Sequence, residues 1–358
     1  MFDIKNLFSG KKQVVGLDIG SSSLKLVEVL DSADGYLLNH FSQVSLPRGI
    51  IVDGLLVDQR ALTEKVKELF KNSGCSKKAI VTSLSGHSVI VKKVNFSTME
   101  EEELRELIRD EAAKYLPFDN MDDINFDFEI LGSSEYNPNQ MDVLIVAAKK
   151  EVVNSYVDAL MDAGLSVAIM DVDSFALETM FEENYDYQEN EMVVIVNIGA
   201  TITNIGVIKS ATSVFTRDFT LGGNAVTEAI QERFGLTFEE AEMIKSGKMV
   251  FDDTARREVM ASLLSFAEPL ILEIERSIEY FQSSYGGASI KKIILSGGGA
   301  SLPGLAGELY QRLNIETEIV NPFRKISINR KKLDPETMDH IASIAAVGVG
   351  LALRRIGD

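Results

Sequence analysis

The chain has 358 residues, a formal net charge of −18 at pH 7, one cysteine and three histidines. This length allows two domains with cores of their own, while the negative charge disfavours broad binding to nucleic acid or to an anionic membrane. A single cysteine excludes a disulfide framework within the chain, and the scattered histidines provide no ligand set for a transition metal.

No segment has the character of a targeting or membrane-spanning sequence. Residues 1–12 lack the apolar stretch of a signal peptide, and the longest uncharged apolar run, over 341–353, is only about 13 residues long, too short to cross a bilayer. Small residues in that run, such as Ala345 and Gly348, suit a helix packed tightly against a neighbour. We expect a cytoplasmic protein without direct membrane insertion, held at a membrane only through partners.

The first half of the chain predicts alternating strands and helices, which indicates an α/β fold. Apolar residues at helical spacing, among them Leu62 and Val66, predict a helix that ends before Gly74, a residue type common just after helices. A second helix is expected over 149–163. Strands are expected over residues 14–18, 25–30, 36–45, 79–84 and 166–171.

Residues 88–147 predict a self-contained strand–helix–strand–strand insert. Thr98 and Glu101 have the spacing of a capping box, which would start the helix. The strands of the insert are expected over 88–96, 125–131 and 141–147. The apolar face of its helix is expected to comprise Leu104, Leu107, Ile108 and Tyr115.

In the second half, helices are expected over 223–235, 238–246 and 254–284, with a kink at Pro269 in the last one. The acidic segment 182–191 is suited to a domain boundary. A closing helix over 337–355 would return to the first domain. The expected domains are therefore a first domain in two parts (1–87 and 148–190), the insert (88–147), a second domain (191–335) and a C-terminal helix (336–358).

Three glycine-rich turns each follow a strand-like apolar run: a first turn at 20–23, a second turn at 199–202 and a third turn at 297–299. The first two continue into another apolar run, so each predicts a hairpin whose backbone N–H groups can face an anion. The third leads toward a helix. One such turn alone is usually an ordinary hairpin. The recurrence, with Asp18 and Asn197 each two residues before a glycine, predicts two hairpins that contact one phosphate chain from both sides.

The order and spacing of these turns resemble the phosphate-1, phosphate-2 and adenosine motifs of actin-like ATPases. The resemblance implies a duplicated actin-like (ribonuclease H-like) fold with two domains around a nucleotide cleft. Within that superfamily the chain resembles the PilM family of type IV pilus assembly proteins over essentially its whole length. The insert is similar to the extra subdomain that this family shares with the division protein FtsA. The blocks that carry the resemblance lie at 15–25, 46–54, 111–118, 144–153, 171–176, 273–277, 321–323 and 346–354.

The resemblance implies binding of ATP with Mg²⁺ by residues of the three turns. Asp18 would hold the ion through water, or alternatively would cap N–H groups of its own turn. Lys25 would be a cation for the phosphates or a solvated strand charge, and Leu302 would shape the third turn. The other implied contacts are Gly20, Ser21, Ser22 and Ser23 in the first turn, Gly199, Ala200, Thr201 and Thr203 in and after the second, and Gly297, Gly298 and Gly299 in the third.

Asn197 departs from the acid that actin-like ATPases commonly carry at this position. An amide supplies no negative charge and cannot act as a general base, so hydrolysis is expected to be weak or absent. Asn197 remains the candidate that positions water or Mg²⁺, and capping of the turn at Gly199 is the alternative. Glu242 and Lys245 share a helix face and resemble ribose and adenine contacts, with a surface ion pair as the alternative.

The resemblance implies an ATP-binding scaffold of pilus biogenesis. Its partners would be the cytoplasmic N-terminal peptide of the inner-membrane protein PilN, other inner-membrane pilus assembly proteins and assembly ATPases, with self-association left open. An FtsA-like filament-forming division protein and, less favoured, an actin-fold small-molecule kinase are the alternatives. The insert and the neighbouring first-domain surface are expected to dock the peptide, on a strand edge or, preferably, in a groove between helix and sheet.

Overall fold

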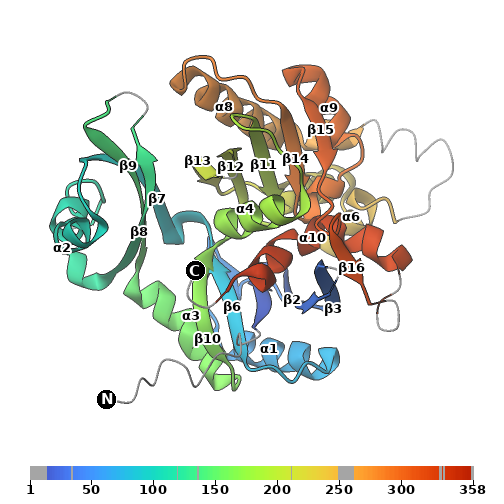
Figure 1. The fold of residues 1–358 in the computed structure, drawn as a ribbon. Coiled ribbons are helices and arrows are strands. Elements are labelled where there is room, and N and C mark those ends of the chain that lie inside the picture. The colour runs from blue at the N-terminus through green and yellow to red at the C-terminus, as the bar shows by residue number, and fades with distance from the viewer. Residues whose placement is uncertain are drawn as a thin grey trace.

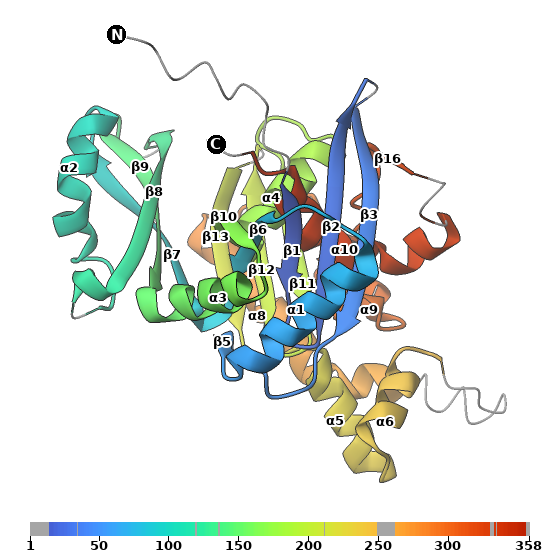
Figure 2. The same ribbon diagram turned by 90° about the horizontal axis from the view of Figure 1, so that it is seen from below.

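The computed structural model describes residues 14–33, 35–118, 120–134, 137–210, 212–248, 262–329, 333 and 335–355. Two large sheets form the centre of the molecule, and a smaller three-stranded sheet stands to one side of them (Figure 1 and Figure 2). Among the residues just given, no helix has both the length and the apolar character that crossing a bilayer requires.

The first sheet has six strands in the order β10-β6-β1-β2-β3-β16. Neighbours among β1, β2 and β3 pair antiparallel, whereas β6 pairs parallel with β1 and β10 parallel with β6. The bounds of these strands are β1 (Val15–Ile19), β2 (Ser23–Ser32), β3 (Gly35–Ser45), β6 (Ala79–Leu84), β10 (Ser166–Val172) and β16 (Ile326–Ile328). Both faces of β1 are buried, which is why its sequence is a nearly continuous apolar run.

The second sheet repeats this plan in the order β13-β12-β11-β14-β15. Its strands are β11 (Met192–Ile198), β12 (Thr203–Lys209), β13 (Thr212–Phe219), β14 (Lys292–Ser296) and β15 (Glu316–Ile319). Pairing runs antiparallel, antiparallel, parallel, parallel from β13 to β15, as it does from β3 to β10 in the first sheet. The duplication expected from the paired hairpins is therefore present in the topology.

Helices and sheets alternate in layers. Side chains of α1 and α3 pack on one face of the first sheet, and α4 and α10 fill the space between the two sheets (Figure 1). The outer face of the second sheet packs against α5, α6, α8 and α9. The bounds are α1 (Gln59–Ser73), α3 (Lys150–Asp162), α4 (Asp173–Asn184), α5 (Gly223–Phe234), α6 (Phe238–Lys245), α8 (Glu268–Ser284), α9 (Leu305–Leu313) and α10 (Pro335–Leu353).

The small residues of α10 permit unusually close packing. A Cβ added to Gly350 would lie 1.7 Å from the carbonyl oxygen of Ala176 in α4, and one added to Gly348 would lie 2.6 Å from a methyl of Val27 in β2. A Cβ on Gly16 in β1 would meet the Gly348 carbonyl oxygen at 2.3 Å. The expectation of tight packing by this apolar segment is confirmed, and α10 lies against both α4 and the first sheet.

The insert has the expected strand–helix–strand–strand order, with sheet order β7-β9-β8. Its elements are β7 (Val89–Ser97), α2 (Glu101–Ala112), β8 (Ile124–Ser133) and β9 (Gln140–Lys149). The predicted capping box is wrong: Glu100 occupies the N-cap position, because the Thr98 amide is still bonded to the Asn139 carbonyl oxygen at 3.1 Å. Leu107 is 45% exposed, so the buried face of α2 is narrower than predicted.

Two further expectations differ from the structure. Residues 262–266 are helical as expected, but a turn at Ala267 separates them from α8 in place of a kink at Pro269, and Pro269 lies in the first turn of α8, where a missing N–H costs no helical hydrogen bond. Residues 254–261 of the predicted long helix lie outside the described residues. The strand β16, from the range 191–335 expected for the second domain, pairs parallel with β3 and so extends the first sheet.

Candidate functional site

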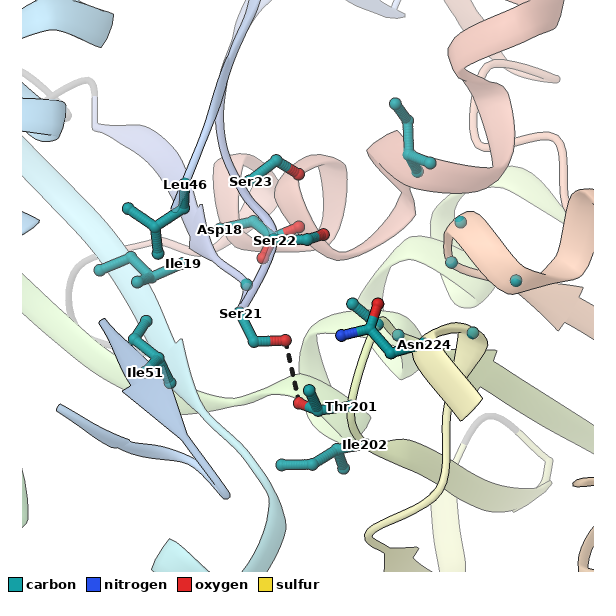
Figure 3. A pocket seen from close by; sticks show the side chains of 18 of the residues that line it. Asp18, Ile19, Ser21, Ser22, Ser23, Leu46, Ile51, Thr201, Ile202 and Asn224 are labelled. Carbon is teal, nitrogen blue, oxygen red and sulfur yellow. Dashed lines mark hydrogen bonds between the residues drawn. The ribbon is translucent and has the colours of Figure 1, made fainter. Parts of the chain in front are cut away.

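All three glycine-rich turns meet at one cavity of about 730 Å³ between the two large sheets (Figure 3). The predicted site residues that line it are Asp18, Gly20, Ser21, Ser22, Ser23, Lys25, Asn197, Gly199, Ala200, Thr201, Glu242, Lys245, Gly297, Gly298 and Gly299. The duplicated topology explains this convergence, since β1 and β11 are equivalent strands that each end at the cavity. Residues far apart in sequence are thereby brought to one place.

Two predicted contacts do not line the cavity. Thr203 is fully buried at the start of β12, and its hydroxyl donates to the carbonyl oxygen of Leu221 at 2.7 Å. Leu302 is buried in the core of the second domain, where it follows the short helix η4 (Gly298–Ser301). Alternation along β12 turns Thr203 away from the cleft, whereas burial of its apolar side chain in the core takes Leu302 away from it.

The first turn is a tight connection between β1 and β2. The Gly20 amide donates to the Ser23 carbonyl oxygen at 3.1 Å, which leaves the serine hydroxyls at the cavity wall. Asp18 and Lys25 are directly opposite each other in the strand register, and Lys25 Nζ lies 3.0 Å from Asp18 Oδ2. The cleft therefore contains a carboxylate and an ammonium group placed side by side at the mouth of the hairpin.

The second turn is connected to the first across the cleft. The Thr201 hydroxyl donates to the Ser21 hydroxyl at 2.9 Å, and Figure 3 shows this contact between the two hairpins. The amides of Gly223 and Asn224 at the start of α5 donate to the carbonyl oxygens of Gly199 and Ala200. The start of α5 thus fixes the second turn, and both of its residues also line the cavity.

Asn197 lies at the end of β11 and is almost completely buried. Its side-chain amide donates to Asn204 Oδ1 at 3.1 Å, so its orientation is set by the neighbouring strand β12. The Gly199 amide donates instead to the Ile202 carbonyl oxygen at 2.9 Å. Capping of the turn through the Gly199 amide, the alternative considered for Asn197, is therefore not the arrangement present.

Glu242 and Lys245 form part of a connected polar group on α6. Lys245 Nζ lies 2.7 Å from Glu242 Oε2 and donates to the Thr227 hydroxyl of α5 at 2.9 Å, and that hydroxyl donates to Glu242 at 2.7 Å. Lys245 also donates to the Gly223 carbonyl oxygen at 3.1 Å. Glu242 and Lys245 thus form an ion pair, which was the alternative to nucleotide contacts, and both residues also line the cavity.

The third turn needs glycine because the backbone of β11 approaches it closely. Gly297 has φ 82°, and a Cβ there would lie 2.4 Å from the Ile198 carbonyl oxygen. A Cβ on Gly299 would lie 2.2 Å from a methyl of Ile198. The Gly297 amide donates to the Ser343 carbonyl oxygen of α10 at 2.8 Å, which connects the third turn to the closing helix.

The sequence interpretation missed Asp173, the first residue of α4, which lines the cavity with Ser83 and Ser85. Burial raises the pKa of Asp173 to about 7 and the negative charge of Asp18 adds to the rise, while hydrogen bonds from the two serines oppose it. The Ser83 hydroxyl donates to Asp173 Oδ1 at 2.5 Å. The acid lies within a block noted for family resemblance, but its burial beside a second carboxylate has no sequence signature.

Arg48 was also missed, although it belongs to another of the resembling blocks. It lines the cavity from the first domain, forms an ion pair with Glu228 of α5, and its guanidinium lies 4.4 Å from the ring centre of Phe238 in α6. Arg48 therefore connects the two walls of the cleft, as does the Thr201–Ser21 hydrogen bond.

A second cavity of about 350 Å³ lies where the insert joins the rest of the molecule. It is lined by Gly86, Val89, Ile90, Val91, Val172, Ser174, Thr216, Arg217 and Asp218. The groove expected between α2 and its sheet is instead filled, since Leu104, Ile108 and Ala112 pack against β7 and β9 as a closed core.

The chain is similar to a solved PilM–PilN type IV pilus biogenesis complex, at 30% identity with a TM-score of 0.85, covering 97% of this chain and 100% of that one. The ethanolamine utilization protein EutJ from Carboxydothermus hydrogenoformans has 18% identity and a TM-score of 0.57, over 95% of this chain and 89% of that one. A diol dehydratase-reactivating factor has 9% identity and a TM-score of 0.53, over 95% and 99% of the two chains.

The last two similarities concern the fold alone. Together with the repeated sheet topology they confirm the expected α/β actin-like fold. The family model of the type IV pilus assembly protein PilM matches residues 16–356, which is nearly the whole chain. With the 30% identity to a chain of the solved PilM–PilN complex, this match establishes that the protein belongs to the PilM family of type IV pilus assembly proteins.

Proposed function

We propose that this protein is a nucleotide-binding scaffold of type IV pilus assembly. It would take ATP with Mg²⁺ in the cleft between its two large sheets, and it would hold the N-terminal peptide of PilN at the junction with the insert. The observation that carries the nucleotide part is the meeting of the first and second turns at one cavity, where Thr201 and Ser21 are hydrogen-bonded across the cleft.

The size and chemistry of the cavity support a nucleotide. A volume of about 730 Å³ lies within the usual range of small-molecule sites. Backbone N–H groups and serine hydroxyls of the first turn, with Lys25, would contact the phosphates, while the glycines of the third turn leave room for backbone approach. Glu242 and Lys245 would lie at the ribose and base.

The residues present also fit Mg²⁺ bound largely through water. The described residues contain no group of three or more histidine, cysteine, aspartate and glutamate side chains able to hold a metal ion. Mg²⁺ usually keeps several waters and binds through one or two carboxylates together with phosphate oxygens. Asp18 would be that carboxylate, reaching the ion through water. The ion would supply positive charge against the phosphate chain.

The PilN peptide has a different candidate site. Each of the two large sheets and the three-stranded sheet of the insert contributes an outermost strand to the second cavity. These strands are β10, β13 and β7. An outermost strand can accept an extended peptide through its free backbone groups. The buried Ser174 hydroxyl, which also lines the cavity, has no hydrogen-bond partner among the described residues. A peptide backbone would satisfy that hydroxyl.

This docking site replaces the groove between α2 and its sheet. The apolar segments Val89–Val91 of β7 and Val172 of β10 would contact apolar peptide side chains, and Asp218 would favour a basic one. Binding to a membrane-anchored PilN would place this protein at the cytoplasmic face of the inner membrane. Contacts with other pilus assembly proteins and assembly ATPases belong to the same proposal.

Titration with a synthetic PilN N-terminal peptide tests the docking site. Val91→Glu places a charge in the second cavity, and we expect it to weaken peptide binding at least tenfold because an unpaired charge would be desolvated. The comparison variant carries Glu103→Lys and Glu106→Lys on the exposed face of α2, and its affinity should match the wild type.

Circular dichroism would establish that both variants are folded. Weakening by the α2 charge reversals, with wild-type affinity in Val91→Glu, would move the docking site to the outer face of the insert. Failure of the wild-type protein to bind the peptide would contradict the scaffold function itself.

A further inference from the structure

The two cavities share a wall. Along the chain, neighbouring residues face different cavities: Ser85 lines the nucleotide cleft and Gly86 the second cavity, and Asp173 lines the cleft while Ser174 lines the second cavity. The wall consists of the start of α4 and of the short helix η2 (Gly86–Ser88), which joins β6 of the first domain to β7 of the insert. A shift of η2 therefore changes both cavities.

The second domain contacts η2 on both sides of this wall. Gly86 has φ 68°, and a Cβ there would lie 2.6 Å from Ile202 Cδ1, the last residue of the second turn. On the other side, the Gly86 amide donates to Asp218 Oδ2 of β13 at 2.7 Å. Ile202 lines the cleft and Asp218 lines the second cavity. Gly86 therefore contacts one lining residue of the cleft and one lining residue of the second cavity.

The two contacting residues are mechanically connected within the second sheet. Asp218 is opposite Asn204 in the pairing of β13 with β12, and Asn204 accepts the hydrogen bond from Asn197 in the cleft. Any rotation of the second sheet that opens or closes the cleft moves Asp218 relative to Gly86, because Gly86 belongs to the first domain. The hydrogen bond then has to lengthen, or η2 and β7 have to follow.

We propose that the hydrogen bond from Gly86 to Asp218 couples nucleotide binding to peptide binding, and this inference rests on the proposed function of the two cavities. Nucleotide in the cleft fixes the relative position of the domains and thereby the width of the second cavity at Gly86 and β7. By thermodynamic reciprocity the peptide then changes nucleotide affinity by the same factor. The contacts form a contiguous path from one cavity to the other.

Peptide titrations with and without saturating Mg²⁺ and a non-hydrolysable ATP analogue test this coupling. For the wild type we expect the two dissociation constants to differ at least fivefold, the lower end of the roughly 5–150-fold range typical of allosteric coupling. In Asp218→Ala we expect weaker peptide binding with and without the analogue, because Asp218 also lines the second cavity, but the ratio of the two constants should fall to about one. Reverse titrations of the analogue with and without peptide should give the same ratio.

Two further variants distinguish loss of the hydrogen bond from loss of the Asp218 charge and from a change in the lining of the second cavity. Asp218→Asn retains an oxygen that can accept the Gly86 amide, so its coupling ratio should stay near that of the wild type. Arg217→Ala alters a neighbouring residue that also lines the second cavity. Arg217 forms its ion pair within the second domain, with Glu273 at 2.6 Å, so its loss breaks no contact with Gly86. Arg217→Ala should change peptide affinity equally with and without nucleotide, which preserves the ratio.

The possible failures are distinguishable. A wild type that binds both ligands with a ratio near one overturns the coupling and leaves the proposed function intact. A coupling ratio in Asp218→Ala equal to that of the wild type, or lost equally in Asp218→Asn, overturns the assignment to this hydrogen bond. A wild type that binds neither peptide nor analogue overturns the proposed function and this inference with it.

Discussion

At the scale of single residues, the chemistry of the cleft depends on which side chains carry negative charge. Asp18 is paired with Lys25 at 3.0 Å, whereas Asp173 has a pKa raised to about 7 by burial and by the nearby charge of Asp18. Burial and the charge of Asp18 thus favour the protonated form of Asp173. Asn197 cannot accept a proton from water. Neither Asp173 nor Asn197 thus supplies the fully ionised carboxylate that a general base in the cleft requires.

We expect slow ATP hydrolysis by the wild type and faster hydrolysis by Asn197→Asp. A carboxylate at this position would accept a hydrogen bond from attacking water, and a positioned general base typically contributes about 10²–10⁴-fold to rate. Phosphate release at saturating Mg²⁺·ATP is the measurement, with at least a tenfold increase expected. ATP affinity, measured in parallel, shows whether the substitution acts on chemistry or on binding. A brisk wild-type rate would show that another group positions the water.

At the scale of elements, the glycine positions determine how closely helices and turns approach the sheets. The close contact of Gly350 with the Ala176 carbonyl oxygen brings α10 against α4 between the two sheets. Through the Gly297–Ser343 hydrogen bond, α10 also supports the third turn. The same helix, α10, therefore packs against α4 in the core and supports the third turn at the cleft.

Gly350→Ala should lower the free energy of unfolding by at least about 2 kcal/mol, because the added methyl overlaps backbone that cannot move independently. The matched control is Gly307→Ala in α9, where nothing lies within 4 Å of the added Cβ. That control should gain up to about 1 kcal/mol from helix propensity alone. Urea unfolding of the two variants gives both values. Equal stabilisation of both would contradict the packing described for α10.

The elements also show what the sequence can predict. Hairpins, turns and the insert follow from local patterns, since alternation, glycine spacing and apolar runs are set by neighbours along the chain. Contacts that depend on the tertiary fold could not be predicted from the sequence. Thr203 turns into a hydrogen bond with Leu221, and β16 joins a strand nearly 300 residues earlier, at β3. The burial of Asp173 beside Asp18 likewise depends on the fold, which is why the sequence left it unnoticed.

At the scale of the whole molecule, the two domains are joined by contacts on either side of the cleft. Arg48 reaches α5 and α6 from the first domain, Thr201 meets Ser21 at the turns, and Asp218 holds Gly86 at the shared wall. The position of one domain relative to the other therefore affects the nucleotide cleft and the second cavity together. The proposed coupling between nucleotide and peptide depends on this arrangement.

The central claim is that Mg²⁺·ATP binds between the first and second turns, and titration calorimetry of Asp18→Ala tests it most directly. The control is Asp142→Ala in the insert, where an equally buried aspartate pairs with Lys93 at 2.6 Å. We predict that Asp18→Ala lowers Mg²⁺·ATP affinity at least about tenfold, equivalent to about 1.4 kcal/mol, because the carboxylate that holds the ion is lost. Asp142→Ala should bind as the wild type does. Wild-type affinity for Mg²⁺·ATP in Asp18→Ala would contradict the assignment of the cleft.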